Sequence, residues 1–509
     1  MTTFMESIKN QQQQYTENGA VGYATTSHDL LDLNFAIPSF RKDIGYDYLN
    51  KFDKMIHEDA NLTLRWLLFL RDIREGMGER DTFRDFLYCL SQFDSELCLN
   101  FIDKVDIAKF GRYDDYVDLF AKLDKELPLE KKIRDKIVEV LSKKLNEDIV
   151  NCMQKKPISL LAKWLPSEKA SSKLKKKLAS ELAIEFGMTK QEYRKTLSKL
   201  RKYLKVVEVD MSANKWSDIE YEKVPSGANL RYSDAFYRHD AERRNEYLTS
   251  LAKGETKINA NALFLYDIVH KYNVFNLGCF YRDAYIKLDE TIEQLWKAQE
   301  PPKEFANTLV IRDGSGSMLT RVGNSDVTAL EVASAITIYL SEYNSEEYKN
   351  KFITFSRIAK LVDISDCDTL LDKLLRLKKE GDMENTNVEN VLSLVLRAMR
   401  ESGKSVDRLL FISDMGYDQG TERPDEVVFE HWQKKYEEAG FKMPKLVFWN
   451  VNSRTNTIPV NQNENGVILV SGFSKNIVDM VMSPQIDPYK VLLDKLMNER
   501  YNVVDKVIQ

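Results

Sequence analysis

The chain lacks long apolar runs, a signal-peptide pattern and paired cysteines, and each absence excludes a class of protein. None of its apolar runs reaches the roughly 18–20 residues needed to span a bilayer. The polar start, MTTFMESIKNQQQQ, has no apolar signal region. The five cysteines form no CxxC pair, so neither a disulfide framework nor a zinc site is indicated. We therefore expect the chain to be in a reducing compartment, the cytoplasm, with no membrane contact.

Histidine is also scarce, and the pattern of the five histidines gives no sign of catalysis. They form no HExxH or paired motif, and no nucleophile–base set is readable around His28, His57, His239, His270 and His431. We therefore expect a chain that is not an enzyme.

Its 509 residues suggest two to four domains, and a hydrophobic content of 43% suffices for large cores.

The net charge of −5 conceals a strong local asymmetry. Residues 301–509 contain 26 basic and 31 acidic residues, whereas residues 1–300 contain 48 of each. Within the balanced part, residues 151–205 contain 15 basic and only 4 acidic residues. A local excess of this size can attract a polyanion even to an acidic protein.

Residues 1–300 have the periodicity of helices almost throughout. Gly and Pro separate amphipathic runs at residues 62–72, 91–105, 130–145, 171–185, 241–252 and 260–271. Many short helices with short breaks are typical of paired helices stacked as an α-solenoid. No exact sequence repeat is present, so an irregular bundle is the alternative.

After the segment Trp296–Glu304, which we interpret as a linker, the pattern changes to alternating strands and helices. The expected strands are residues 308–312, 351–355, 359–362, 408–412, 444–451 and 466–470, and the expected helices are residues 327–342, 368–379, 388–401 and 426–439. This alternation predicts a doubly wound parallel sheet. The fold class is therefore an N-terminal α-solenoid, residues 1–300, followed by an α/β domain, residues 301–509. Ligands of such sheets bind beyond the carboxyl ends of the strands.

Asp313 directly follows the first of these strands and opens the loop Asp-Gly-Ser-Gly-Ser. Mg²⁺ prefers six oxygen ligands, which carboxylate and hydroxyl groups supply, and glycines allow a tight turn around the ion. Two more loops should converge there, one with Asn385-Thr386-Asn387 and one with Ser413-Asp414-Met415-Gly416. The sequence therefore predicts a site for Mg²⁺ or Mn²⁺ with the ligands Asp313, Ser315, Ser317, Thr386 and Asp414.

Other interpretations of this loop fit less well. A Walker loop requires Gly-Lys-Ser/Thr, and a nucleophile elbow requires Gly-x-Ser-x-Gly. An aspartyl-phosphate enzyme would have a second acid where Ser315 stands. A flexible Ser/Gly turn with a helix-capping role is the remaining structural alternative.

The constellation resembles the metal-ion-dependent adhesion site of von Willebrand A domains. That resemblance rests on Asp-x-Ser-x-Ser after the first strand, Thr386 on the second loop and Asp414 on the third. It implies that these ligands surround the ion, some through water, and that the sixth position is left for a partner's carboxylate.

The helical part resembles the TROVE module of Ro-type RNA-binding proteins, and of viral, plant and fungal relatives that pair this module with a von Willebrand A domain. The resemblance covers nearly the whole chain. It is carried by residues 16–20, 70–84 (LRDIREGMGERDTFR), 110–119 (FGRYDDYVDL) and 224–240 (VPSGANLRYSDAFYRHD), and by LVIRDGSGSM, LVFWNV and SGFSKNIVDMVM in the second half.

This resemblance implies a closed ring of HEAT-like repeats that the A domain completes. Single-stranded RNA ends would enter the ring, and structured RNA would lie on its basic outer face. The family's basic helix pair includes a histidine near residues 193–204, and this chain has none there. That departure leaves open whether the same small structured RNA is recognised.

The residues themselves also point to RNA, independently of the resemblance. Positions 194, 195, 198, 199, 201 and 202 cover one helical face, and such basic stripes bind phosphates by counterion release. Tyr193, Tyr203 and Trp164 could stack on bases. A solvated basic face with the aromatics in the core is the alternative. The candidate residues of the two basic clusters are Lys173, Lys175, Lys176, Lys177, Arg194, Lys195, Lys199, Arg201 and Lys202.

Three further candidates, Arg231, Arg238 and His239, would line the ring interior, or else belong to an ordinary capped helix. Near the N-terminal motifs, the interleaved charges of residues 71–85 favour salt bridges over RNA contacts. Asp114, Asp115 and Asp118 are better explained by solvent exposure or by pairing with Arg112 than by a metal.

Together these patterns predict a monomeric, non-enzymatic RNA-binding scaffold of ribonucleoprotein type. It would hold single-stranded ends or a small structured RNA, and its A domain would hold Mg²⁺ and a partner's Asp or Glu. A protein–protein adaptor, with the helices as a platform, is the alternative.

Overall fold

The structure is a computed structural model of the full chain. The structure describes residues 13–15, 21–23, 25–275, 286–345, 347–355, 358–380, 388–415, 428–452, 467–485 and 487–509. They form two compact units, each assembled from two separate stretches of sequence. The first unit contains residues 1–52 and 259–495, and the second contains residues 53–258 and 496–509.

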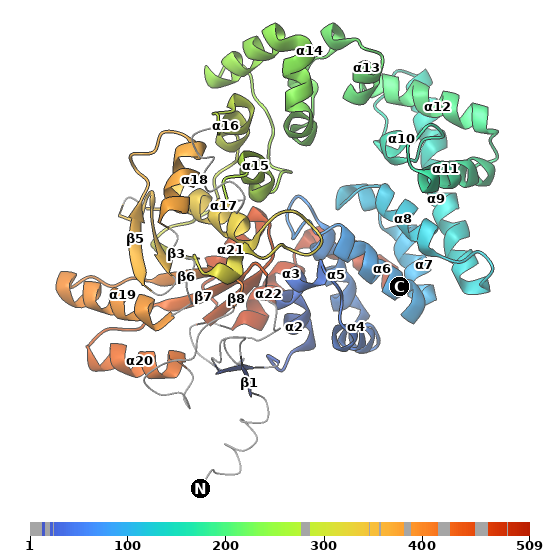
Figure 1. Cartoon of the computed structure of the whole chain (residues 1–509). Helices are drawn as coiled ribbons and strands as arrows, with labels where there is room; N and C mark the ends of the chain where they lie inside the picture. Colours follow the sequence, from blue (N-terminus) through green and yellow to red (C-terminus); the bar gives the residue numbers. More distant parts are fainter. Residues whose placement is uncertain are drawn as a thin grey trace. The chain divides into compact units, whose positions relative to one another are not determined.

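Helices dominate the chain up to residue 297 (Figure 1). A short strand pair, β1 (Gln13–Tyr15) and β2 (Val21–Tyr23), precedes them. The α-helices are α2 (Asp29–Phe35), α3 (Ile37–Phe40), α4 (Tyr46–Glu58), α5 (Ala60–Arg71), α6 (Asp81–Phe93), α7 (Ser95–Lys104), α8 (Asp114–Lys122), α9 (Pro128–Met153), α10 (Leu161–Trp164), α11 (Lys173–Glu185), α12 (Lys190–Tyr203), α13 (Val207–Ser212), α14 (Ser226–Ala252), α15 (Leu265–Tyr272) and α16 (Glu290–Lys297). Three short 3-10 turns lie between them, η1 (Ile107–Lys109), η2 (Trp216–Asp218) and η3 (Tyr221–Lys223).

The helices of the second unit contact their neighbours in sequence, as expected of stacked helix pairs. Helix α6 packs on α5, α7 and α8, and α9 packs on α7, α8 and α12. The predicted helices overlap the observed ones, but several boundaries differ. The helix expected over residues 130–145 is α9, which continues to Met153, and the helix expected over residues 260–271 begins at Leu265. The expected helix over residues 91–105 begins only at Ser95, because α6 extends to Phe93. Helix α14 is kinked at Asp240, where the backbone leaves the helical region.

From residue 308 onward the chain alternates between strands and helices, as predicted. The strands are β3 (Thr308–Asp313), β4 (Lys351–Phe355), β5 (Ala359–Asp363), β6 (Arg408–Ser413), β7 (Lys445–Asn450) and β8 (Val467–Ser471). The helices are α17 (Ala329–Glu342), α18 (Leu370–Lys379), α19 (Val388–Ser402), α20 (Val428–Glu438), α21 (Val478–Val481), α22 (Pro488–Leu496) and α23 (Asp505–Ile508), with 3-10 turns η6 (Gly316–Leu319), η7 (Lys475–Ile477) and η8 (Glu499–Val504).

The six strands form one sheet in the order β5-β4-β3-β6-β7-β8. All neighbours are parallel except β4 and β5. That pair is antiparallel because only three residues separate the strands, too few for a parallel crossover. The sheet is thus mixed at this edge and parallel elsewhere. Its central strands are buried along their length, as expected of a sheet covered by helices such as α17, which packs on β3, β4 and β6.

The segment predicted to be the linker is partly packed within the first unit. It begins inside α16, where Trp296 is buried and donates from Nε1 to Glu342 at 3.1 Å. Gln299 is also buried and donates to the carbonyls of Ala260 and Leu295. The division of the chain at residues 300 and 301 stays a prediction, since the compact units follow contacts between distant segments.

The last fourteen residues, 496–509, belong to the helical second unit. Arg500 forms an ion pair with the buried Asp72, and Tyr501 donates to the same carboxylate at 3.3 Å. Asp505 pairs with Arg65 at 2.7 Å. The ring of Tyr501 also stacks on Phe110, with centroids 6.0 Å apart. The end of the chain is therefore part of the core that α5 builds.

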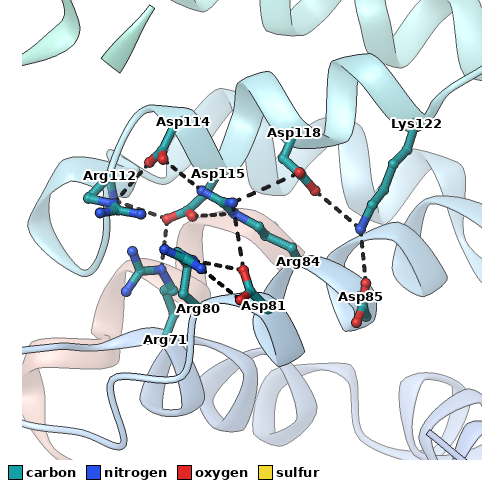
Figure 2. Close-up of polar contacts among 10 residues, drawn as sticks. All are labelled: Arg71, Arg80, Asp81, Arg84, Asp85, Arg112, Asp114, Asp115, Asp118 and Lys122. Carbon is teal, nitrogen blue, oxygen red and sulfur yellow. Dashed lines mark hydrogen bonds and ion pairs between the residues drawn. The ribbon is translucent and has the colours of Figure 1, made fainter. Parts of the chain in front are cut away.

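A network of ion pairs joins α5, α6 and α8 (Figure 2). Asp115 is 0% exposed and accepts from Arg71 Nε at 2.7 Å and from Arg84 Nε at 2.8 Å. Arg84 also pairs with Asp114 at 2.9 Å, and Arg112 pairs with Asp114 at 3.0 Å. Salt bridges, the role predicted for the arginines of residues 71–85, are therefore present. Their main partner, Asp115, lies outside that segment and is buried, so it does not face solvent.

The network also explains the glycine in the segment FGRYDD. A Cβ on Gly111 would lie 2.5 Å from both Arg71 Nε and Asp115 Oδ2. No side chain fits at that distance, so a glycine is required for the buried pair to form.

Replacing Asp115 with alanine is expected to destabilise the helical unit strongly. Arg71 would remain buried without its carboxylate, and breaking a buried pair in this way costs about 3–5 kcal/mol. The matched control is Asp85→Ala, which removes a half-exposed partner of Lys122 in the same network and should cost less than about 1 kcal/mol. Urea titrations of both variants would measure this, and equal costs would contradict the assignment.

His270 on α15 contacts the start of α17 within the first unit. Its Nδ1 lies 2.9 Å from Glu331 Oε1, and the other Glu331 oxygen accepts from the amide of Thr328 in a capping box. The hydrogen bond to Glu331 raises the pKa of His270 above its usual value.

The pKa of His270 predicts a dependence of stability on pH. The pKa of His270 in the folded protein lies above the value near 6.5 that it has in the unfolded chain. The contact with Glu331 therefore stabilises the fold fully below about pH 6.5, and this stabilisation is lost as the pH rises through the folded pKa. The contribution should be no more than about 1 kcal/mol, since the ring is one-third exposed. The melting-temperature gap between wild type and His270→Phe should thus be wider at pH 5.5 than at pH 9. A melting-temperature gap that widens as the pH rises would refute the stabilising role of this contact.

None of the helices that the structure describes is long and apolar enough to cross a membrane.

Candidate functional site

The expected cation loop lies where the strand order reverses direction. The spatial order of the strands is β5-β4-β3-β6-β7-β8. The strands that follow β3 in the chain, β4 and β5, lie on one side of it, whereas β6, β7 and β8 lie on the other side. The direction in which strands are added therefore reverses between β3 and β6. Ligands of open α/β sheets bind beyond the carboxyl ends of the strands at this switch point. Asp313 is the last residue of β3, and Asp414 directly follows β6. The two carboxylates therefore stand at the position where the fold binds ligands.

Hydrogen bonds tie the loop after β3 to the end of β6. Ser413 Oγ donates to Asp313 Oδ2 at 2.6 Å, and the amide of Ser315 donates to Oδ1 at 2.9 Å. The hydroxyl oxygens of Ser315 and Ser317 lie 2.9 Å apart. Because β3 and β6 are parallel and in register, these oxygens gather at one edge of the sheet.

The electrostatics of this edge are unfavourable for negative charge. Asp313 is 0% exposed and Asp414 is 3% exposed. Burial and the neighbouring Asp414 carboxylate raise the pKa of Asp313 above its usual value, although hydrogen bonds from Ser413 and Ser315 act in the opposite direction. Two buried carboxylates that repel each other are an arrangement that a bound cation would stabilise.

Backbone features support the same place. Gly314 donates its amide to the carbonyl of Phe355 at 2.9 Å, and a Cβ there would lie 3.1 Å from Thr354 Oγ1. Met415, next to Asp414, has a φ of 63° although it is not glycine and is buried. Such left-handed backbone costs about 1–3 kcal/mol and is typical of functional loops.

Four of the five predicted ligands are thus brought to one edge, while the fifth, Thr386, lies outside the described residues together with Asn385, Asn387 and Gly416. Within the described ranges, no group of three or more His, Cys, Asp or Glu side chains could hold a metal ion. The candidate site therefore consists of two carboxylates and two serine hydroxyls. This set of hard oxygen donors fits Mg²⁺ or Mn²⁺.

Sequence reasoning overlooked Arg312, the residue before Asp313. It is 1% exposed and donates from Nη1 to Ser334 Oγ at 3.0 Å and from Nη2 to the carbonyl of Leu377 at 3.2 Å. Burial lowers its pKa to about 10, while the charge of Asp313 raises it. An arginine within the apolar strand TLVIR was the available signal for a buried charge beside the site.

The predicted basic residues lie on α11 and α12 in the second unit. Eight of them are exposed, and none has a described carboxylate within ion-pair distance: Lys173, Lys175, Lys176, Lys177, Arg194, Lys195, Lys199 and Lys202. Some lysines of α8 and α9 do pair with an Asp or Glu, namely Lys122, Lys136 and Lys144. Helix α12 buries Leu197 and Leu200 on its opposite side, so its basic face is directed to solvent.

Arg201 and the three aromatic candidates have contacts within the protein. Arg201 donates to the carbonyls of Ala162 and Leu165, at the end of α10, at 2.8 and 2.7 Å, and burial lowers its pKa. Tyr193 is 0% exposed and donates to the carbonyl of Pro166, so it belongs to the core and does not stack on bases. The half-buried Trp164 packs against the guanidinium of Arg112, 4.1 Å from its ring centroid. Tyr203 remains exposed, and its hydroxyl donates to the carbonyl of Lys156 at 2.9 Å.

Arg231, Arg238 and His239 are exposed on the first half of α14. The His239 ring stacks on Trp216, with centroids 4.2 Å apart and an interplanar angle of 7°. Their assignment to a ring interior stays a prediction.

Two domain families match the chain, one on each side of the change from helices to strands. Residues 168–301 match a Domain of unknown function (DUF2828). Residues 307–500 match another Domain of unknown function (DUF7788). The first contains both basic helices, and the second contains the candidate cation loop.

The chain is similar to a viral protein over nearly its full length. It is 28% identical to "Uncharacterized protein L728" of Acanthamoeba polyphaga mimivirus over 517 residues, which cover 95% of this chain and 87% of the viral protein. A search of solved structures finds the crystal structure of the Deinococcus radiodurans RO (RSR) protein, at 14% identity and a TM-score of 0.42, covering 94% of this chain and 99% of that one.

Proposed function

We propose that this chain is a non-enzymatic RNA-binding scaffold of Ro ribonucleoprotein type. The observation that carries the proposal is the set of eight exposed basic side chains on α11 and α12, none of which lies within ion-pair distance of a described carboxylate. Unpaired lysine and arginine side chains gain most when they meet phosphates, because counterions are released from the nucleic acid. Single-stranded ends or a small structured RNA are the proposed ligands.

The position of the first cluster strengthens this proposal. Lys173, Lys175, Lys176 and Lys177 occupy the first turns of α11, which has no acidic residue in its first turn. The positive end of the helix dipole disfavours cations there, so the arrangement costs helix stability. Both the dipole and the lysines favour a bound anion, which offsets that cost.

A divalent cation, Mg²⁺ or Mn²⁺, is proposed at the other site, with Asp313, Ser315, Ser317 and Asp414 as ligands, and with Thr386 if its loop converges there. The cation would supply a coordination position for an anionic oxygen of a partner. The adaptor function, in which this position grips an acidic protein, is the second candidate, and the buried acidic pair at the switch point favours it.

Binding of single-stranded RNA across a salt series tests the proposal. The logarithm of the binding constant should fall linearly with the logarithm of salt concentration, because the contacts are with phosphates. Absence of RNA binding at low salt would contradict the scaffold and favour the adaptor.

A further inference from the structure

Arg312 is a buried cation that forms no hydrogen bond to an anion among the described residues. Its described acceptors are all neutral: Ser334 Oγ, Thr354 Oγ1 at 3.3 Å and the carbonyl of Leu377. Its Nε has no hydrogen-bond partner, and no carboxylate in the described part of the chain lies within ion-pair distance. A guanidinium keeps its charge even in such surroundings. One full positive charge is therefore fixed inside the sheet.

This charge acts on the cation loop through space. Neighbouring residues of a strand point to opposite faces of the sheet, so Arg312 adjoins Asp313 in the chain without bonding to its carboxylate. Asp313 and Asp414 are both buried, and little water screens the three groups from one another. Their interaction is therefore stronger than it would be at the surface.

The balance of charge depends on what is bound. With both carboxylates ionised and no metal, the three groups carry a net charge of −1. A divalent cation changes this to +1. A monoanionic oxygen ligand on the cation returns the buried group to neutrality, which a low-dielectric interior favours.

We propose that Arg312 makes cation binding at this loop depend on an anionic co-ligand of carboxylate type. The guanidinium repels the bare cation and attracts the anion that follows it, so the two ligands bind cooperatively. By linkage, each ligand raises the affinity of the other by the same factor. The inference rests on the proposed cation site and identifies the residue that selects its partner's charge.

The test is a calorimetric titration of the full chain with Mn²⁺, in chloride buffer and in acetate buffer of equal ionic strength. Wild type should bind Mn²⁺ more tightly in acetate. Arg312→Gln, which keeps hydrogen-bonding groups but loses the charge, should bind Mn²⁺ in chloride at least about tenfold more tightly, because one nearby repelling charge is gone. It should also lose most of the acetate effect. Arg312→Lys should resemble wild type.

Two controls separate charge from damage to the fold. Arg244→Gln removes another fully buried arginine, in the other unit, and should leave Mn²⁺ affinity unchanged. The acetate effect in wild type needs no variant, so the test survives if Arg312→Gln does not fold.

Each outcome decides between the two claims. If wild type binds Mn²⁺ but acetate has no effect, or Arg312→Gln binds no more tightly, the role of Arg312 is wrong and the cation site stands. If Arg312→Lys behaves like Arg312→Gln, shape and not charge is responsible, and the inference also fails. If Mn²⁺ binds to no variant in either buffer, the cation site itself is refuted.

Discussion

Replacing Lys173, Lys175, Lys176 and Lys177 together with glutamine is expected to weaken single-stranded RNA binding and to flatten its salt dependence. Each lost phosphate contact should reduce the salt slope by ~0.7, so the loss of all four would reduce it by about 2.8. At ~0.1 M salt the affinity should fall roughly 10²–10³-fold. The measurement is RNA affinity for wild type and variant across a salt series.

A matched control keeps the change of net charge but moves it to paired lysines. Lys104, Lys122, Lys136 and Lys144 each have an acidic partner within 4.0 Å, and their replacement by glutamine should change the slope far less. A second test set, Arg194, Lys195, Lys199 and Lys202, should act like the first. Arg201 is left out because it holds the carbonyls at the end of α10. Unchanged slopes in both test sets would refute the RNA face.

Replacing Asp313 or Asp414 with alanine is expected to abolish Mg²⁺ and Mn²⁺ binding and to leave the fold intact. Each carboxylate supplies half of the negative charge at the site, whereas removing one relieves the repulsion between two buried acids. Mn²⁺ titration measures the loss, and circular dichroism checks the fold. Asp366→Ala, an exposed acid paired with Arg376 in the same unit, is the control. Unchanged binding in both Asp variants would show that the metal lies elsewhere.

The two sites should respond independently. Altering Asp313 should leave RNA affinity nearly unchanged, because the cation loop is proposed for a carboxylate and belongs to the other compact unit. An RNA defect confined to the Asp313 variant would mean that the α/β domain holds RNA through a metal-bridged phosphate.

Local patterns were sufficient to predict much of this fold. Short apolar runs between helical segments predicted all six strands of the sheet, from TLVIR to GVILV. The position of Asp313 after the first of these strands predicted where the cation loop would lie. The carboxyl ends of parallel strands meet at one edge, so Asp313 and Asp414 could be placed together without any structure. Helical periodicity likewise predicted that α12 directs Arg194, Lys195 and Lys199 to solvent.

Features that depend on distant residues could not be predicted in this way. Tyr193 looked available for stacking because it adjoins basic residues, yet packing against the segment around Pro166 places it in the core. Arg201 occupies the same broad helix face as Lys202, but only the folded chain brings α10 beneath it. The burial of Asp115 and the return of residues 496–509 to the helical unit are likewise products of tertiary contacts.

We propose that RNA lies on α11 and α12. Photo-crosslinking of a single-stranded RNA containing 4-thiouridine to the full chain, followed by mass spectrometry of the crosslinked peptides, would show which residues contact the RNA. We predict crosslinks within residues 173–203 that disappear when the four lysines of α11 are replaced. Crosslinks restricted to the loops around Asp313 and Asp414, or unaffected by the lysine replacement, would contradict it.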